Sequence, residues 1–271
     1  MLPAAVVDAF TDAPFTGNPA GLVLLRPQDE NADPSWMQSV AREIGLSETG
    51  FLVPRGTGEY GLRWFTPAVE MELCGHATLA AAHWLWERGE TDESEIRFDT
   101  RGGTLTATRD ADGQITLDFP VVPVIDTGEP PGWRDAFSGA DVRWVGRTGG
   151  SRQLERNALL VADAAALRDL RPDFARVAAL PCGGAIVTAE SDDPRYDVLT
   201  RYFAPACGVD EDPVTGSAHC TVVWHWAPTL GPRLRARQAS ERGGDLIVEL
   251  RGDRVLLGGY AVTVATLDLL V

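Results

Sequence analysis

Three short segments of the sequence carry side chains whose types suit the transfer of a proton. Glu48 lies in the segment G-L-S-E-T-G-F, and Cys74 and His76 flank Gly75. A second glycine, Gly216, is flanked by four polar residues: Glu211, Asp212, Thr215 and Ser217. A carboxylate in a closed, partly apolar pocket has its pKa raised toward neutral pH, as a group that accepts and returns a proton requires. The segments therefore predict acid–base chemistry, provided that the fold encloses them.

Each of these residues also has a purely structural interpretation. Asp212 precedes a proline, and its role can be limited to capping a helix. Glu48 follows Ser47 and can be a solvated turn residue, while His76 can be a satisfied polar residue at a helix start. Ser217 can bond the backbone and nothing else. The sequence leaves both interpretations open.

The two glycines open segments that are apolar on every side. We expect central helices near 75–88 and 216–227, beginning at Gly75 and Gly216. A helix that is apolar all round is buried all round, and a curled sheet would bury it. The helix N-terminus presents unpaired N–H groups and a partial positive charge. Two such ends facing each other would form a pocket for a small carboxylate.

The segment 63–84 can be aligned with the segment 201–226. Each contains Arg-aromatic-Phe-x-Pro-Ala, an acidic loop, a glycine, and an apolar helix that ends in His-Trp. The loop of the second copy is three residues longer. The shared order of these features predicts two related domains.

The expected fold is α+β, with two pseudo-symmetric domains, each a curled, mostly antiparallel sheet or barrel around one central helix. The domains are expected at 1–122 and 123–271, and the terminal strand can pair with the first domain. The Pro- and Gly-rich segment 121–133 is the expected linker. Outside the central helices, Asp33 and Pro34 predict a helix that runs to Gly45.

Composition excludes several classes of function. The chain has 271 residues, is 44% hydrophobic and carries a formal net charge of −15, which opposes binding to nucleic acid or an anionic membrane. All 24 basic residues are arginine, so the chain has no lysine to form a Schiff base or to serve as a Walker lysine. Four scattered cysteines and an N-terminus without the features of a signal peptide lead us to expect a cytoplasmic protein.

No cofactor or metal is expected. Cys74 with His76, and His219 with Cys220, do not match the spacing of zinc ligands. No G-x-G-x-x-G segment follows a strand, so the sequence does not indicate a dinucleotide.

Four segments together are typical of a known family. They are D-A-F-T-D-A-P-F-T-G-N-P-A-G at 8–21, S-E-T at 47–49, C-G-H-A-T-L-A at 74–80 and E-D-P-V-T-G-S-A-H at 211–219. Their order across nearly the whole chain resembles the phenazine-biosynthesis PhzF-like isomerase family, within the diaminopimelate epimerase-like superfamily. The resemblance implies two barrel-like domains with the active site in the cleft between them, no metal or organic cofactor, and commonly a homodimer.

The resemblance also implies roles for individual residues. The catalytic glutamate falls on Glu48, and the other polar catalytic positions fall on His76, Asp212 and Ser217. Backbone at Gly75 and Gly216 is expected to hold the substrate carboxylate, and three further residues complete the expected substrate-binding set: Asn18, Cys74 and Thr215. In the founding activity such groups move a proton between carbons of a cyclic dihydro-hydroxyanthranilate.

One departure keeps other functions open. Diaminopimelate epimerases use two cysteines as opposed bases, whereas this chain has Cys74 at the first position and Thr215 at the second. The pair resembles that of hydroxyproline dehydratases, so Cys74 is either a lone base or a packing residue. The alternatives to a proton-shift isomerase acting on a small carboxylic acid are therefore an epimerase or dehydratase of an amino or imino acid, and a non-catalytic binding protein.

Overall fold

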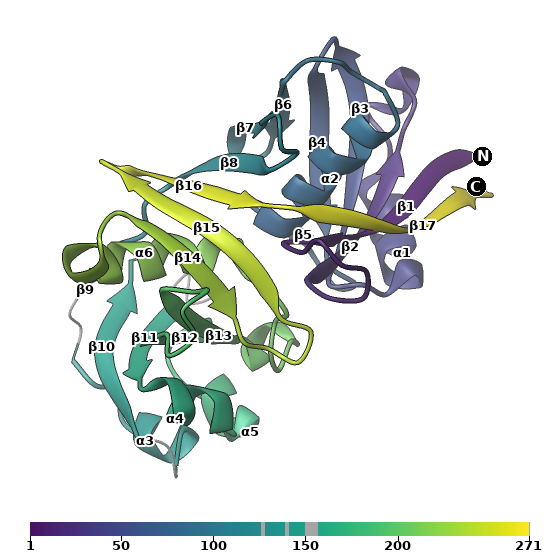
Figure 1. Cartoon of the computed structure of the whole chain (residues 1–271). Coiled ribbons are helices and arrows are strands. Elements are labelled where there is room, and N and C mark those ends of the chain that lie inside the picture. Colours follow the sequence, from purple (N-terminus) through teal and green to yellow (C-terminus); the bar gives the residue numbers. More distant parts are fainter. Residues whose placement is uncertain (126–127, 139–140, 150–156, 271) are drawn as a thin grey trace. The chain divides into compact units, whose positions relative to one another are not determined.

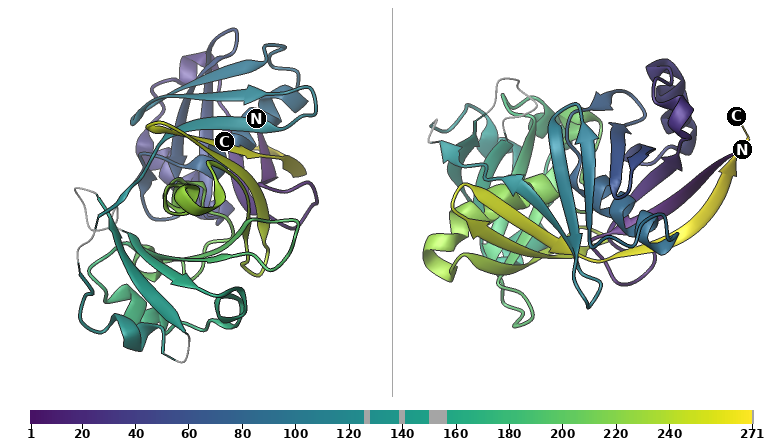
Figure 2. Two further views of the ribbon diagram at one scale, coloured as in Figure 1. Left: turned by 60° about the vertical axis from the view of Figure 1, so that its left-hand side comes forward. Right: turned by 90° about the horizontal axis from the view of Figure 1, so that it is seen from above.

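The computed structural model describes residues 1–125, 128–138, 141–149 and 157–270 (Figure 1). The chain divides into two compact units, one formed by Met1–Phe119 with Gly258–Val271 and the other by Pro120–Leu257. The last strand, β17 (Ala261–Leu269), lies antiparallel to β1 (Leu2–Ala9) in the first unit, so both ends of the chain lie close together there (Figure 2). The chain thus passes from the first unit to the second after Phe119 and returns to the first at Gly258.

The first unit is a curled sheet with one helix inside it and another on its outer face. Besides β1 and β17, its strands are β2 (Asn18–Leu24), β3 (Glu48–Gly56), β4 (Glu59–Phe65), β5 (Glu70–Met71), β6 (Glu95–Thr100), β7 (Gly103–Arg109) and β8 (Ile115–Pro120). Its helices are η1 (Pro27–Asp29), α1 (Pro34–Ile44) and α2 (Gly75–Glu87). In Figure 1, α2 runs beside the strands on the concave face of this sheet.

The second unit has the same kind of elements. Its strands are β9 (Val124–Ile125), β10 (Val142–Thr148), β11 (Asn157–Ala162), β12 (Gly184–Glu190), β13 (Val198–Phe203), β14 (Arg233–Gln238), β15 (Gly244–Arg251) and β16 (Arg254–Gly259), the last of which reaches the unit boundary. Its helices are α3 (Trp133–Ala136), α4 (Ala164–Asp169), α5 (Phe174–Ala178), η3 (Pro205–Cys207) and α6 (Gly216–Leu230). Strand β9 falls in the expected linker segment 121–133, and helix α3 begins at its last residue, Trp133. Residues 126–127 of that segment lie outside the described part.

Strand pairing shows that the two units are related. Along the series β1, β2, β3, β4, β6 and β7, successive pairs alternate between antiparallel and parallel, beginning antiparallel. The series β10 to β15 repeats that alternation in the same order. The helices α2 and α6 occupy equivalent crossovers, one before β6 and the other before β14. The predicted fold class, two pseudo-symmetric domains with a central helix each, is confirmed.

The central helices begin at the two glycines that the sequence singled out. In α2, the segments 76–82 and 84–86 are buried, and Trp84 and Leu85 are almost completely enclosed. Burying one such large apolar side chain contributes about 1.5–3 kcal/mol. In α6, burial extends only to Val223, and residues 224–230 are half-buried or exposed. The expectation that both helices are enclosed along their whole length is therefore wrong for the end of α6.

Helix α1 holds the strand that begins with Glu48. Its start is capped by Asp33, whose carboxylate accepts a hydrogen bond from the Ser35 N–H at 2.9 Å, and it ends at Gly45 with φ 71°, as the sequence predicted. Met37 and Val40 on its buried face pack against Phe51 of β3. The outer face of β3 is thereby covered, which fixes the strand beneath α1.

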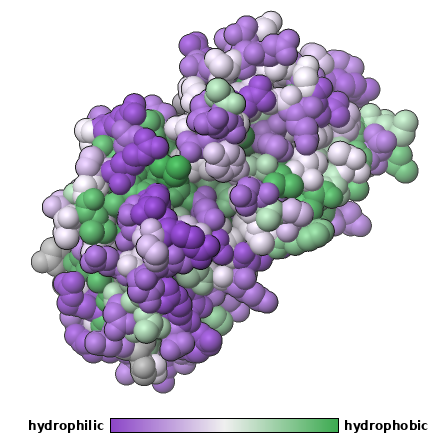
Figure 3. Space-filling view, viewed as in Figure 1, coloured by the Kyte–Doolittle hydropathy of each residue, from purple (hydrophilic) through white to green (hydrophobic). Residues whose placement is uncertain are grey.

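None of the helices among the described residues is both long and apolar enough to cross a bilayer. The face shown in Figure 3 is largely hydrophilic with smaller hydrophobic areas, as most proteins have.

Candidate active site

Glu48 is the first residue of β3, and its side chain is only 17% exposed. Burial raises the pKa of Glu48 to about 7, and a hydrogen bond from Ser47 opposes this only in part. The carboxyl group is thus poised to gain or lose a proton near neutral pH. The alternative that Glu48 is a solvated turn residue is wrong.

His76, the second residue of α2, lies directly against this carboxyl group. Its Nε2 atom is 3.2 Å from Glu48 Oε2, and its side chain is 7% exposed. On the other edge of the ring, Nδ1 is 3.3 Å from Nδ2 of Asn18. Because the amide nitrogen of Asn18 only donates, Nδ1 accepts and the proton of neutral His76 sits on Nε2, facing Glu48. The imidazole can therefore stabilise the ionised carboxylate through a hydrogen bond.

Asn18 and Ser47 complete this network. Asn18 is fully buried, and its Oδ1 lies 3.3 Å from the Ser47 hydroxyl, which is also 3.3 Å from the carbonyl of Pro19. The same hydroxyl lies 3.5 Å from His76 Nε2. Register explains why the segments meet: β2 and β3 run parallel, with Ala20 opposite Glu48. The first residues of both strands, Asn18 and Glu48, are thus brought to the start of α2.

Cys74 precedes α2 and is buried. Its Sγ lies 3.6 Å from Nδ1 of His76, so the thiol shares that nitrogen with Asn18. Cys74 is the N-cap residue, but its side chain makes no capping hydrogen bond in the described structure. Instead its carbonyl accepts from the Thr78 hydroxyl at 2.5 Å. The arrangement places a thiol beside the imidazole without committing it to the helix end.

The loop before Asn18 is shaped by residues that the sequence analysis did not single out. Gly17 has φ 68°, and a Cβ there would lie 2.2 Å from the carbonyl oxygen of Ala9. Only glycine fits that position. The buried carboxylate of Asp8 accepts a hydrogen bond from the Phe15 N–H at 2.7 Å and holds the same loop. The motif T-G-N-P was the available signal, because a glycine before a buried asparagine suggests a constrained backbone.

The second group of predicted residues lies in the second unit, before α6. Thr215 is the N-cap residue, and its hydroxyl donates a short hydrogen bond to Oδ2 of Asp212. Asp212 is therefore bonded to the cap residue Thr215 and is not itself the cap. Gly216 is buried, whereas Ser217 is exposed at the first turn. The structure thus brings Asp212, Thr215 and the start of α6 together.

Gln238 organises this second group and was missed by sequence reasoning. It is fully buried at the end of β14, and its Nε2 donates to the carbonyl of Asp212 at 2.7 Å. Its Oε1 accepts from the N–H of Thr215 at 2.8 Å. One amide side chain thus ties both ends of the segment 212–215. No local pattern around a lone glutamine on a strand indicates such a role.

Glu48, Cys74 and His76 also form a group with metal-binding atoms, all within 4.8 Å of one another. A thiolate, an imidazole and a carboxylate are donors that suit zinc. However, Glu48 contacts Nε2 of the ring and Cys74 contacts Nδ1, on opposite sides. The three side chains are thus linked through the two ring nitrogens of His76.

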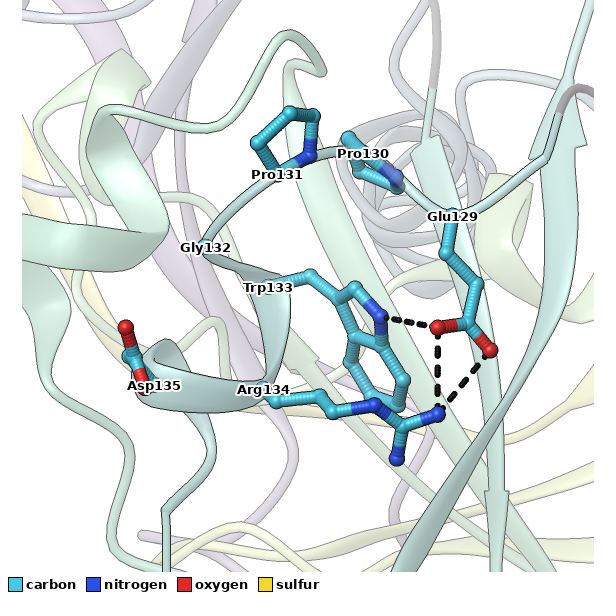
Figure 4. Close-up of a pocket in the computed structure, with 7 residues that line it drawn as sticks. All are labelled: Glu129, Pro130, Pro131, Gly132, Trp133, Arg134 and Asp135. Carbon is cyan, nitrogen blue, oxygen red and sulfur yellow. Dashed lines mark hydrogen bonds and ion pairs between the residues drawn. The ribbon is translucent and has the colours of Figure 1, made fainter.

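A separate hollow of about 310 Å³ lies on the turn Glu129–Asp135 of the second unit (Figure 4). There Glu129 accepts hydrogen bonds from the Trp133 indole and from Arg134. The guanidinium of Arg134 lies 4.5 Å from the centre of a Trp133 ring. The hollow is open, its charges are paired, and none of the predicted site residues lines it.

Comparison with known proteins gives this arrangement a family. The family model of phenazine biosynthesis-like proteins, PhzC–PhzF, matches residues 7–266. The chain belongs to this family. An uncharacterized isomerase of Pseudomonas aeruginosa is 44% identical over 96% of this chain and 95% of its own length. An uncharacterized isomerase of Halalkalibacterium halodurans is 43% identical over 99% of this chain and 98% of its own.

Solved structures agree with the PhzC–PhzF assignment. A PhzF-family protein from Enterococcus faecalis superimposes with a TM-score of 0.87 at 35% identity, covering 98% of this chain and 97% of that one. A hydroxyproline epimerase from Agrobacterium vitis has a TM-score of 0.66 at 14% identity, over 98% of this chain and 90% of that one, and shares the fold alone. As a PhzC–PhzF protein with relatives named isomerases, the chain is an enzyme of the isomerase class.

Proposed function

We propose that this PhzC–PhzF protein is a cofactor-independent isomerase that moves a proton within a small cyclic or unsaturated carboxylic acid. Glu48 is the proton carrier. The observation that carries the proposal is the enclosed Glu48 carboxyl group, with a pKa of about 7, in contact with His76 Nε2 at 3.2 Å. At neutral pH such a group is about half protonated, so it serves equally well as base and as acid.

The reaction needs one group that takes a proton from carbon and returns it elsewhere. The ionised Glu48 removes a proton from a carbon next to the double bond of the substrate, which leaves a delocalised anion. The protonated Glu48 then delivers the proton to another carbon of the same π system, and the starting carboxylate is restored. The Nε2–H of His76 stabilises the carboxylate at the start and end of each cycle.

The substrate's own carboxylate needs donors, and helix starts supply them. The first N–H groups of α2, beginning at Gly75, carry the positive end of the helix dipole, and no side-chain cap competes for them in the described structure. The same holds for α6 at Gly216. We assign Asp212 and Ser217 to positioning and polarising the substrate, with Thr215 and Gly216 as substrate-binding residues beside them.

A second candidate function rests on Cys74. Its thiol lies 3.6 Å from a ring nitrogen of His76, which can accept the thiol proton and leave a thiolate base. A thiolate suits an epimerase or dehydratase of an amino or imino acid. A third candidate, a protein that binds a small acid without turnover, would keep the helix-start donors and need no proton carrier.

Solvent deuterium separates these candidates. The enzyme is incubated in D₂O with cyclohexa-2,5-diene-1-carboxylate, with the dihydro-hydroxyanthranilate that the resemblance implies, and with proline and hydroxyproline. An isomerase incorporates deuterium into an unsaturated acid, and Glu48→Gln abolishes the incorporation. If incorporation survives Glu48→Gln but is lost in Cys74→Ala, the thiol mechanism replaces the proposed one.

A matched control is Glu43→Gln, which changes an exposed glutamate on α1 close in sequence to Glu48. It should leave incorporation unchanged. A binding protein would be stabilised against heat by one of the acids without any incorporation. Mass spectrometry of acids that co-purify with the protein extends the set of compounds beyond those chosen.

A further inference from the structure

Each unit contains an arginine–glutamate pair of the same geometry in the same place. In the first unit, Arg63 Nε is 2.7 Å from Glu70 Oε1, and Nη2 is 3.0 Å from Oε2. In the second, Arg201 Nε is 2.7 Å from Glu211 Oε1, and Nη2 is 2.8 Å from Oε2. Both are two-point contacts, which fix direction as well as distance.

The pairs hold equivalent positions in the repeat. Glu70 and Glu211 each stand five residues before the first residue of the central helix, Gly75 or Gly216. Each arginine lies on the preceding strand, with its guanidinium about 5 Å from the ring of the phenylalanine two residues on. Although the second loop is three residues longer, the spacing between glutamate and helix is the same. The position of each glutamate is thus set relative to the start of the helix, whatever the length of the loop before it.

The second pair is the more enclosed of the two. Arg201 is 8% exposed, and its Nη1 donates to the carbonyls of Leu167 at 3.1 Å and Leu170 at 2.8 Å. Those carbonyls lie at the end of α4, where the helix leaves acceptors unpaired. The guanidinium is therefore fixed on one side by α4 and holds Glu211 with its other side. Loss of Glu211 would leave a buried charge without its partner.

Glu211 is followed at once by Asp212, whose backbone is held on both sides. The N–H of Asp212 donates to the carbonyl of Tyr202 at 3.0 Å, and its carbonyl accepts from Gln238. In the first unit, the segment after Glu70 leads in the same way to Cys74 and His76. Each pair thus stands in the sequence just before the polar residues at a helix start.

We propose that the pairs Arg63–Glu70 and Arg201–Glu211 are positioning clamps that set the two helix starts for the proton shift. The clamp of the second unit positions Asp212, and that of the first positions His76. Apolar residues in place of a buried ion pair such as Arg201–Glu211 often leave stability unchanged, and a half-buried pair such as Arg63–Glu70 contributes little. The presence of such a pair at the same place in both units is therefore better explained by geometry than by stability. The catalytic part of this inference rests on the proposed function.

The first test does not depend on activity. Hydrogen exchange followed by mass spectrometry is compared for the wild type, Glu211→Gln, Arg201→Lys and the control Val187→Ala, a core change on β12 of the same unit. We expect the amides of residues 211–218 to exchange about tenfold faster in the two clamp variants, and less than about twofold faster in the control. If the control speeds exchange in this segment as much as Glu211→Gln, the clamp does not act locally and the inference is overturned.

The second test asks whether Glu211 acts through Asp212. With cyclohexa-2,5-diene-1-carboxylate in D₂O, Glu211→Gln should lower kcat about 10- to 100-fold with a smaller change in KM, because misplacing a group by about 1 Å has that effect. The double variant Glu211→Gln/Asp212→Asn should then be no slower than about half the rate of Asp212→Asn alone. If the fold-reductions in kcat of the two single variants multiply in the double variant, Glu211 acts independently of Asp212 and the inference fails.

The first unit gives a parallel comparison. Glu70→Gln should speed amide exchange in residues 71–77 and leave residues 211–218 unchanged, since each clamp is local. Failure of the proposed function and failure of the clamp inference give different results. A wild type without deuterium incorporation refutes the proposed function, while the amide-exchange results alone then decide whether the clamps exist.

Discussion

The pKa of Glu48 predicts a specific dependence of stability on pH. The folded protein holds this carboxyl group at a pKa of about 7 because the group is buried, against an ordinary value of 4.5. The difference corresponds to about 3 kcal/mol in the free energy of unfolding. Between pH 4.5 and 7 the folded state binds more protons than the unfolded state. The contribution of Glu48 is therefore complete below pH 4.5 and is lost as the pH rises through 7.

The wild-type curve by itself would hide this effect. Burial lowers the pKa of His219 to about 4, so His219 contributes stability that is present above its ordinary value of 6.5 and lost as the pH falls through 4. The two groups oppose each other over nearly the same range. The difference between the wild type and Glu48→Gln removes the contribution of His219 and of the other groups whose pKa values the substitution leaves unchanged. The free energy of unfolding of the wild type minus that of Glu48→Gln should fall by about 3 kcal/mol from pH 4.5 to pH 8.

The assay is urea denaturation at pH values half a unit apart. Hydrogen exchange in β3 is the readout, so that unfolding of the first unit is observed separately. Glu43→Gln, at an exposed position, should give a difference that stays constant with pH. A Glu48→Gln difference that varies by less than about 0.5 kcal/mol across the range would show that the carboxyl group is solvated. In that case the proposed proton carrier loses its physical basis. If the group is enclosed, kcat/KM for deuterium incorporation should also rise through pH 7 and then level off.

Three further variants test the surroundings. Asn18→Leu removes one of the two contacts of His76 Nδ1, the other being Cys74 Sγ, and should lower kcat about 10- to 100-fold. The fraction of the Nε2–H tautomer of His76 should fall in ¹⁵N NMR spectra, and an unchanged fraction would mean that Asn18 does not set the tautomer. Cys74→Ala should leave deuterium incorporation within about threefold of the wild type, and a complete loss would favour the thiol mechanism. Gln238→Leu removes the donor to the Asp212 carbonyl and the acceptor of the Thr215 N–H, and should destabilise the second unit by about 1–3 kcal/mol in urea. No change would mean that other contacts hold the loop.

Much of the fold follows from sequence patterns that depend on neighbouring residues. Helix α1 was predictable from its cap at Asp33 and its terminal glycine, because both signals are local backbone chemistry. The starts of α2 and α6 were predictable because a helix that is apolar all round has to be enclosed. The end of α6 was not, since the same apolar pattern continues past Val223 where the burial stops. How far a sheet covers a helix depends on strand lengths elsewhere in the chain.

The residue types available for chemistry can be read from the sequence, and its repeat predicts two helix starts. The enclosure of Glu48, and the contact that His76 makes with it through Nε2, become visible only in the folded chain. A pKa depends on the solvent that the whole fold removes, and the tautomer of an imidazole depends on partners distant in the chain. Asn18 lies 58 residues before His76, and Gln238 lies 23 residues after Thr215. No local pattern could have shown either contact.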